Sequence, residues 1–189
     1  MKLATCALFL ALRAYAHEGY PIAPVHVTLR AEPDRIIADL RADSIFWIEE
    51  VTGLSPMPAQ DWPAEVRTRV EAYVNAHLKL SAGGVQLSGK LTQARYRQQL
   101  WEVHEEGVFD LRLAYPAIPK GAALTGTSTF YEEYRKKMAK EYLGRKMPYA
   151  GDYRTFVDLP GRKRFRFDLT PDVPSFTVPG DEARRSPFA

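Results

Sequence analysis

Alternating apolar and polar residues recur along the chain in short runs, a pattern typical of β-strands with one buried face. In the clearest run, Phe109 to Tyr115, apolar side chains alternate with Asp110, Arg112 and Ala114. Further runs cover 25–30, 35–41, 44–51, 85–87, 91–103, 124–130, 153–159 and 164–169, with proline or glycine turns between several of them. Short strands at this spacing predict a mainly β fold, an immunoglobulin-like sandwich of two sheets.

Two segments have helical spacing instead of alternation. From Trp62 to about Leu80, valines and Tyr73 recur three and four residues apart, and Pro63 suits the first turn of a helix. The glycines after Ala82 are expected to stop this helix. The second segment consists of charged helix formers and ends at Gly144, a common helix terminator. We therefore predict two inserted helices, at about 62–80 and 131–143, that cover a sheet face or one open end of the sandwich.

The two ends of the chain differ in composition from the part between them. Met1-Lys2 gives a positive start, an apolar run follows, and Ala14-Tyr15-Ala16 is a small-x-small cleavage motif, the order found in secretory signal peptides. The apolar run is shorter than the roughly 20 residues that a membrane span needs. After Thr170 the chain is rich in proline and poor in apolar residues. We expect a signal peptide at 1–16, a β-sandwich domain at 17–170, a flexible tail at 171–189, and a periplasmic or secreted location.

Cleavage of the leader would change the charge and the cysteine content of the chain. The 26 Lys and Arg residues would fall to 24 by loss of Lys2 and Arg13, against 23 Asp and Glu. The resulting net charge of about +1 does not favour a nucleic-acid partner. The single cysteine, Cys6, lies in the leader, so the mature domain would depend on its hydrophobic core alone, which is feasible at this length. The oligomeric state is left open.

Common catalytic signatures are missing from the sequence. There is no Gly-x-Ser-x-Gly motif, no phosphate-binding glycine loop and no His-Glu-x-x-His motif. Adjacent acids such as Glu105-Glu106 point to opposite faces of a strand, so they do not form a two-carboxylate catalytic site by themselves. These features argue against an enzyme. A secreted hydrolase acting through carboxylates is accordingly the last of the three functions considered.

A mature N-terminal histidine would allow metal chelation. If cleavage follows Ala16, His17 brings both a free amine and an imidazole, and one more imidazole would complete a nitrogen set suited to copper or nickel. His26, on the polar face of the first strand, and His104, at a strand end, are the candidates for that ligand. Glu102 shares a strand face with His104 and would orient it. Against this hypothesis, isolated exposed histidines are common, and no close His-x-His spacing supports a site.

Two other groups of residues have simpler explanations. His77 lies on the apolar stripe of the first predicted helix, where a partly buried histidine with one hydrogen bond is expected. Arg164 and Arg166 lie on the strand face opposite Phe165 and Phe167, where they could meet anionic lipid headgroups or a membrane partner. An ordinary solvated face is the alternative, and the near-neutral total charge favours it.

Short segments of the chain resemble the extracytoplasmic β-domain of the hydrogenase/urease accessory family. They are Ala16-His17-Glu18, the strand near Val25–Arg30, and the segment from Phe109 to Pro116. In that family the β-domain precedes several membrane helices and is linked to nickel or cobalt handling. Here two helical insertions are expected, and no membrane helices are expected after the tail. The resemblance implies a relative that works beside a membrane protein.

These observations lead to one expected function and one alternative. We expect an exported, non-catalytic binding or accessory module at the outer face of a membrane, with a membrane protein or the membrane surface as partner. The alternative is a periplasmic copper- or nickel-binding protein that uses His17.

Overall fold

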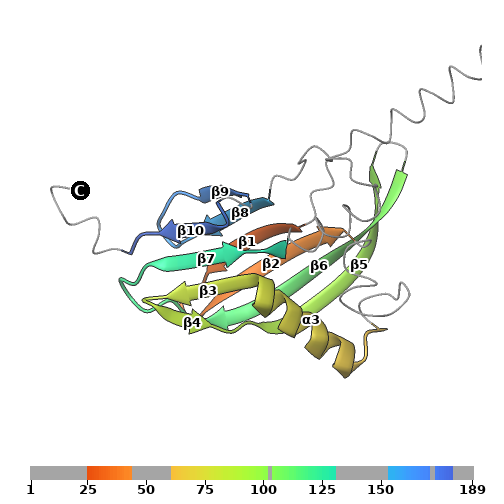
Figure 1. Ribbon diagram of the computed structural model, residues 1–189, viewed down its shortest axis with the longest axis horizontal. Helices are drawn as coiled ribbons and strands as arrows, with labels where there is room; N and C mark the ends of the chain where they lie inside the picture. Colours follow the sequence, from red (N-terminus) through yellow and green to blue (C-terminus); the bar gives the residue numbers. More distant parts are fainter. Residues whose placement is uncertain (1–24, 44–60, 102–103, 131–152, 171–172, 181–189) are drawn as a thin grey trace, which may run out of the picture.

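The structure, a computed structural model, describes residues 25–43, 61–101, 104–130, 153–170 and 173–180 (Figure 1). These residues form one helix and ten strands. The helix is α3 (Ala64–His77). The strands are β1 (Val25–Ala31), β2 (Arg35–Asp43), β3 (Leu78–Ala82), β4 (Val85–Leu87), β5 (Lys90–Trp101), β6 (His104–Pro116), β7 (Leu124–Ser128), β8 (Tyr153–Asp158), β9 (Phe165–Leu169) and β10 (Ser175–Val178).

The strands form two sheets, which confirms the prediction of a mainly β, two-sheet fold. The larger sheet has the order β5-β6-β2-β1-β8-β9, and the smaller has the order β10-β7-β3-β4. Neighbouring strands are antiparallel with one exception, the parallel pair β1 and β8, in which Val27 lies opposite Thr155. The strands predicted at 153–159 and 164–169 are present as β8 and β9, which pair antiparallel on either side of Pro160-Gly161.

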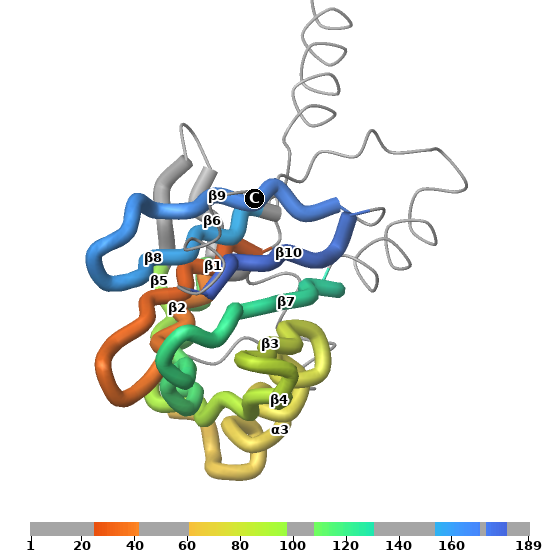
Figure 2. Tube along the Cα trace, turned by 90° about the vertical axis from the view of Figure 1, so that its left-hand side faces the viewer, coloured from red at the N-terminus to blue at the C-terminus, as the bar shows by residue number. Residues whose placement is uncertain are grey.

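The hydrophobic core lies between two layers (Figure 2). One layer is the six-stranded sheet, and the other consists of the four-stranded sheet with α3 beside it. Phe109, Leu111, Leu113 and Tyr115 of β6 all face the core and are at most 2 % exposed. The alternation read from the sequence therefore assigned the buried face of this strand correctly. Under α3, the ring of Phe109 packs against those of Trp62 and Tyr96, at 5.2 Å between centroids in each case.

The helix predicted at 62–80 is present but ends earlier than expected. It ends at His77, and the chain continues directly into β3, where Leu78 and Leu80 are buried and Lys79 is exposed. This alternation has the period of a strand, and pairing with β7 and β4 outweighs the helical propensity of the leucines and the lysine. Gly83 and Gly84, expected to stop the helix, instead have positive φ angles of 57° and 83° and form the turn of the β3–β4 hairpin.

The interpretation of everything after Thr170 as a flexible tail is wrong for Ser175–Val178. These residues form β10, which pairs with β7, and Phe176 and Val178 are buried. The prolines around this segment made its strand pattern hard to recognise in the sequence. The strand is short, lies at the edge of its sheet and buries its two apolar side chains in the core. The second predicted helix, 131–143, lies outside the described residues, as do the predicted strand at 44–51 and the signal peptide at 1–16.

Side chains of α3 take the place of a neighbouring strand at the start of β5. Asn75 donates to the carbonyl oxygen of Gly89 (2.8 Å) and accepts from its N–H (2.7 Å), while Glu71 accepts from the N–H of Leu91 (2.8 Å). The backbone groups of this edge are thus paired without another strand. A residue with a side chain would not fit at Gly89, because the ring of Tyr115 lies where its Cβ would be.

Candidate functional site

Of the predicted metal ligands, the structure describes the side chain of His26 alone. His17 and Glu102 lie outside the described residues, and for His104 only its backbone position, opposite Trp101, is described. His26 lies on the outer face of β1, opposite Arg41, which in turn lies opposite Asp110 of β6. His104 is six positions along β6 from Asp110, about 20 Å of strand. His26 and His104 are therefore alternative partners for His17, and they do not share one ion.

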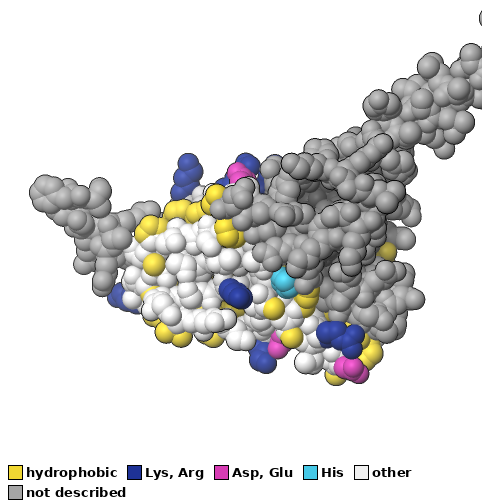
Figure 3. All heavy atoms as spheres, in the orientation of Figure 1, with side chains coloured by type: hydrophobic (Ala, Val, Ile, Leu, Met, Phe, Trp, Pro, Cys, Tyr) yellow, Lys and Arg dark blue, Asp and Glu magenta, His cyan; other side chains and the backbone are white. Residues whose placement is uncertain are grey.

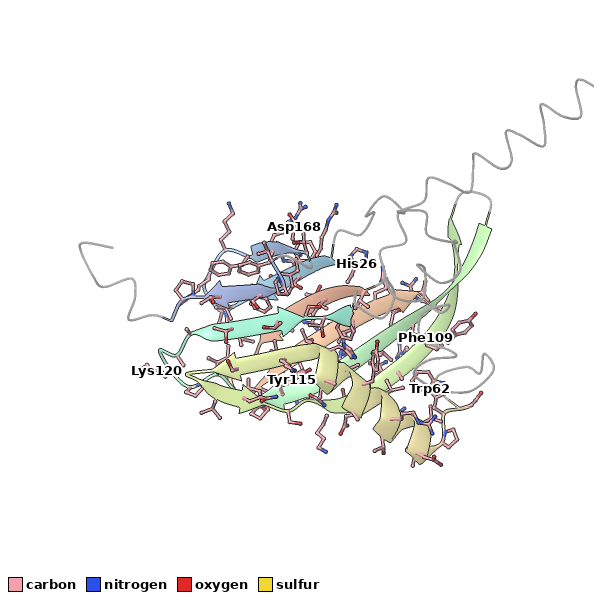
Figure 4. The ribbon with its side chains drawn as sticks, in the orientation of Figure 1. His26, Trp62, Phe109, Tyr115, Lys120 and Asp168 are labelled. Carbon is pink, nitrogen blue, oxygen red and sulfur yellow. The ribbon has the colours of Figure 1, made fainter. Side chains whose placement is uncertain are left out.

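The described residues offer no other metal site. Among them, no three or more histidine, cysteine, aspartate or glutamate side chains lie together in a way that could hold an ion. His77 has the simpler role expected for it: its Nδ1 lies 3.0 Å from Thr129 Oγ1, and its ring stacks on Phe130. Figure 4 shows His26 well away from the aromatic pair Trp62 and Phe109 beneath α3. Over the same ranges, no helix has the length and apolar character that a membrane span requires.

The outer faces of the two sheets differ in chemistry. On the four-stranded sheet, Thr125 lies between Ser81 and Thr177, and Thr127 lies between Lys79 and Ser175. Figure 3, which views the molecule from this side, shows few charged side chains among the coloured residues of this layer. Neutral hydroxyl groups therefore dominate this face.

The outer face of the six-stranded sheet is charged, and we call it the arginine face. It is defined by the described side chains that alternate with the core residues of its strands. Two residues at the strand ends are left out of it: Arg35 of β2, which binds Glu32 at the β1–β2 turn, and Lys90 of β5, which binds Glu71 of α3. The remaining cations are His26 and eight arginines, and the anions are four aspartates: Arg30, Arg41, Arg95, Arg97, Arg112, Arg154, Arg164 and Arg166 with Asp39, Asp110, Asp158 and Asp168. With His26 neutral, these side chains carry an excess of four positive charges, although the expected mature chain as a whole carries about one.

Four charged residues form a square at the centre of the arginine face. On β2 Asp39 is followed two positions later by Arg41, and on β6 Asp110 is followed two positions later by Arg112. The antiparallel register puts Asp39 opposite Arg112 and Arg41 opposite Asp110, so the charges alternate in both directions. Arg112 Nε donates to Asp39 at 2.6 Å, and Arg41 Nε donates to Asp110 at 3.1 Å.

Two further arginines flank this square, one on each side. Arg30 of β1 donates to Asp39 (2.6 Å), and Arg97 of β5 donates through Nε to Asp110 (2.5 Å). Each aspartate is thus held between two guanidinium groups, and the hydrogen bond from Arg112 to Asp39 raises the pKa of Arg112. The square is neutral by itself, so Arg30 and Arg97 supply the positive excess at the centre of the face.

The β8–β9 end of the face is built in a similar way. Arg164 binds Asp158 through two hydrogen bonds, of 2.6 and 2.7 Å, and its guanidinium lies over the ring of Phe156. These hydrogen bonds hold the pKa of the Asp158 carboxyl below its ordinary value, although partial burial opposes them. Arg166 donates to Asp168 at 3.0 Å. The prediction that Arg164 and Arg166 lie opposite Phe165 and Phe167 is confirmed.

The two central carboxylates of the arginine face are taken up by ion pairs, and the arginines around them are donors suited to an anion. Asp39 and Asp110 accept hydrogen bonds from two arginines each, so their carboxylates are occupied as ion-pair partners. Arg41 and Arg112 bind the aspartates through Nε and are about half exposed, so their Nη groups remain donors at the surface. Within the described residues, Nη2 of Arg97 is buried and has no hydrogen-bond partner. Guanidinium forks of this kind bind carboxylates and phosphates.

Sequence reasoning found only part of this surface. It placed Asp110, Arg112, Arg164 and Arg166 on outward strand positions, because each alternates with buried residues in its own run. It did not place Arg30, Arg41 and Arg97 beside them, because that depends on which strands are neighbours and in which register. The spacing Arg95-x-Arg97, which matches Arg164-x-Arg166, was the available signal.

Comparison of the chain with known protein families found no family model that matches, and comparison with curated proteins found no match. The resemblance to the hydrogenase/urease accessory family therefore stays a prediction.

Proposed function

We propose that this chain is an exported, non-catalytic binding module that uses the arginine face to hold an anionic partner at the outer face of a membrane. The observation that supports this most strongly is the concentration of positive charge on one sheet face of a chain whose total charge, without the predicted leader, is nearly zero. Surface ion pairs contribute little to stability, so folding alone does not account for eight arginines on one face. A charged face of this kind attracts and orients an oppositely charged partner.

The proposal also includes an exported location and a membrane protein as partner. A leader with an apolar run and a cleavage motif supports export, and the short resemblance to an accessory family supports a membrane protein nearby. The immunoglobulin-like connectivity of the sandwich also stays a prediction. The alternative function, chelation of copper or nickel by His17 with His26 or His104, depends on residues that the structure does not describe.

Site-specific crosslinking in the cells that make the protein would test this proposal. A photoreactive residue at Thr28, on the arginine face between Asp39 and Phe156, should give adducts in the membrane fraction. The same residue at Lys79, on the outer face of the four-stranded sheet, is the matched control and should give none. Equal adducts from both positions, or adducts from Lys79 alone, would show that the arginine face is not the binding surface.

A further inference from the structure

We infer that the arginine face binds the carboxylates of an acidic polypeptide segment, and not a lipid surface. This inference rests on the proposed function, because it names the chemistry of the partner at the same face.

The kind of cation on the face favours carboxylates as its ligand. All eight strongly basic side chains of the face are arginines. The described lysines lie elsewhere: Lys79 on the other sheet, Lys90 at the start of β5 beside Glu71, and Lys120 and Lys163 in turns. A diffuse anionic surface attracts lysine and arginine alike, whereas the planar guanidinium fork matches the two oxygens of one carboxylate.

The second argument is that these guanidinium groups are held in fixed positions. Arg41, Arg97 and Arg112 each bind their aspartate through Nε, which leaves the outer pair of nitrogens of Arg41 and Arg112 as donors, whereas Nη2 of Arg97 is buried. The aspartates thereby hold each arginine in place before a partner arrives, so less side-chain entropy is lost on binding. Fixed donors favour discrete groups on a folded or extended polypeptide over mobile headgroups.

The third argument is the absence of exposed apolar anchors on the face. The exposed large hydrophobic side chains of the described residues are Val85, in β4, and Val173, before β10. Ile37 and Val108 alternate with core residues on β2 and β6, yet they are only 6 % and 7 % exposed. Phe156 of β8 also lies on the face, but it is partly buried and the Arg164 guanidinium lies over its ring. The face therefore has no large, fully exposed apolar side chain to insert below a layer of headgroups, whereas peripheral membrane binding commonly combines charge with apolar insertion.

The fourth argument is spacing. Arg30 and Arg97 lie on either side of β2 and β6, three strand intervals apart, and Arg30 is level with Ala114 of β6 whereas Arg97 is level with Val108. About 14 Å across the sheet and about 20 Å along it put the two backbones roughly 25 Å apart on a diagonal. Acidic side chains at alternate positions of an extended segment project to the same side about 7 Å apart, so residues about eight apart span roughly the same distance. A segment that crosses β2 and β6 with acids at alternate positions would present carboxylates to both flanking arginines.

Binding of defined probes to the purified protein, with the leader absent, tests this inference. The probes are a labelled twelve-residue peptide of alternating glutamate and threonine, vesicles of phosphatidylglycerol and phosphatidylcholine, and a short DNA duplex. The peptide should bind, and Arg30→Gln with Arg97→Gln should weaken it about tenfold or more, because charge-assisted hydrogen bonds are lost. Arg69→Gln with Lys79→Gln removes the same charge from other surfaces and should leave binding nearly unchanged.

A charge-conserving variant separates fork recognition from simple attraction. Arg30→Lys with Arg97→Lys keeps both charges and should still weaken peptide binding several-fold, whereas binding by charge alone would be preserved. Thermal unfolding of each variant checks that it is folded. Tighter binding of vesicles or DNA than of the peptide, with the same arginine dependence, would overturn this inference. The proposed function would stand in that case, because the arginine face would still be the binding surface. Probe binding that is indifferent to the flanking arginines would contradict both proposals.

Discussion

Single residues determine how closely side chains pack on the inner face of the four-stranded sheet, and Gly126 of β7 is an example. Its position lies between the ring of Phe176 on β10 and the side chain of Leu80 on β3. A Cβ built at Gly126 would overlap the Phe176 ring, which is buried in the core. The absence of a side chain here lets β10 lie against β7 with its aromatic residue turned inward.

Substitution of this glycine should therefore destabilise the fold. Gly126→Ala is expected to lower the free energy of unfolding by about 1–3 kcal/mol, the usual cost of overpacking a core. Urea denaturation measures it, with the exposed Thr177→Ala of β10 as control. Phe176→Leu introduced together with Gly126→Ala should recover part of the loss, because it removes the clashing ring atoms. A Gly126→Ala protein as stable as the control would mean that β10 does not pack on β7 as described.

The ion pair of Asp158 and Arg164 predicts a specific dependence on pH. The folded-state pKa of Asp158 lies below its ordinary value of 3.8, so the stabilisation is present above that pH and is lost as the pH falls further. Asp158→Asn should lower the thermal midpoint at neutral pH, and the difference from the natural protein should shrink below pH 3.8. Asp168→Asn, which removes a 52 % exposed carboxylate, is the control. A difference that grows on acidification would contradict the assignment.

At the scale of elements, the contact between α3 and β5 depends on side chains that act as a strand. Asn75→Ala leaves both backbone groups of Gly89 without their partners in a part-buried position. We expect a loss of about 1–3 kcal/mol in unfolding free energy. Asn75→Asp keeps the acceptor for the Gly89 N–H and loses the donor to its carbonyl. Its unfolding free energy should therefore lie between those of the natural protein and Asn75→Ala. The exposed Arg69→Ala on the same helix should change little, and a loss as small for Asn75→Ala would refute this role.

The sequence predicted elements better than it predicted their arrangement. Alternation identified β1, β2, β6, β8 and β9, because each run places its apolar residues on one side. It failed at Leu78–Leu80, where three residues fit a helix and a strand equally and pairing with β7 decides between them. It failed again at Ser175–Val178, since four residues among prolines carry too short a pattern. The parallel contact of β1 with β8 joins residues more than a hundred positions apart, and no local pattern encodes it.

The same limit explains why the candidate site was only partly predictable. Asp110 and Arg112 could be placed outward from their own strand, but their partners Arg41, Asp39 and Arg97 come from β2 and β5. The charge balance of the whole chain, near zero after removal of the leader, masked the segregation of arginines onto one face. Net charge is a property of composition, whereas a binding surface depends on which strands are neighbours.

At the scale of the whole molecule, the two-layer architecture leaves two outer sheet faces of different character. The four-stranded sheet presents hydroxyl groups, and the six-stranded sheet presents the arginine face. A module with one neutral and one cationic face has a defined orientation toward an anionic partner, with the neutral face turned away. This orientation is what the proposed role at a membrane requires.

The most direct test of this account is the amount of mature protein that stays with the membrane fraction as the salt concentration is raised. The natural protein, which we expect to begin at His17, should be retained at low salt and released at about 0.5 M, where charge interactions are screened over a few ångströms. The Arg30→Gln, Arg97→Gln protein should be released already at low salt, and the Arg69→Gln, Lys79→Gln protein should behave as the natural one. Retention of the arginine-face variant equal to that of the natural protein would contradict the central claim.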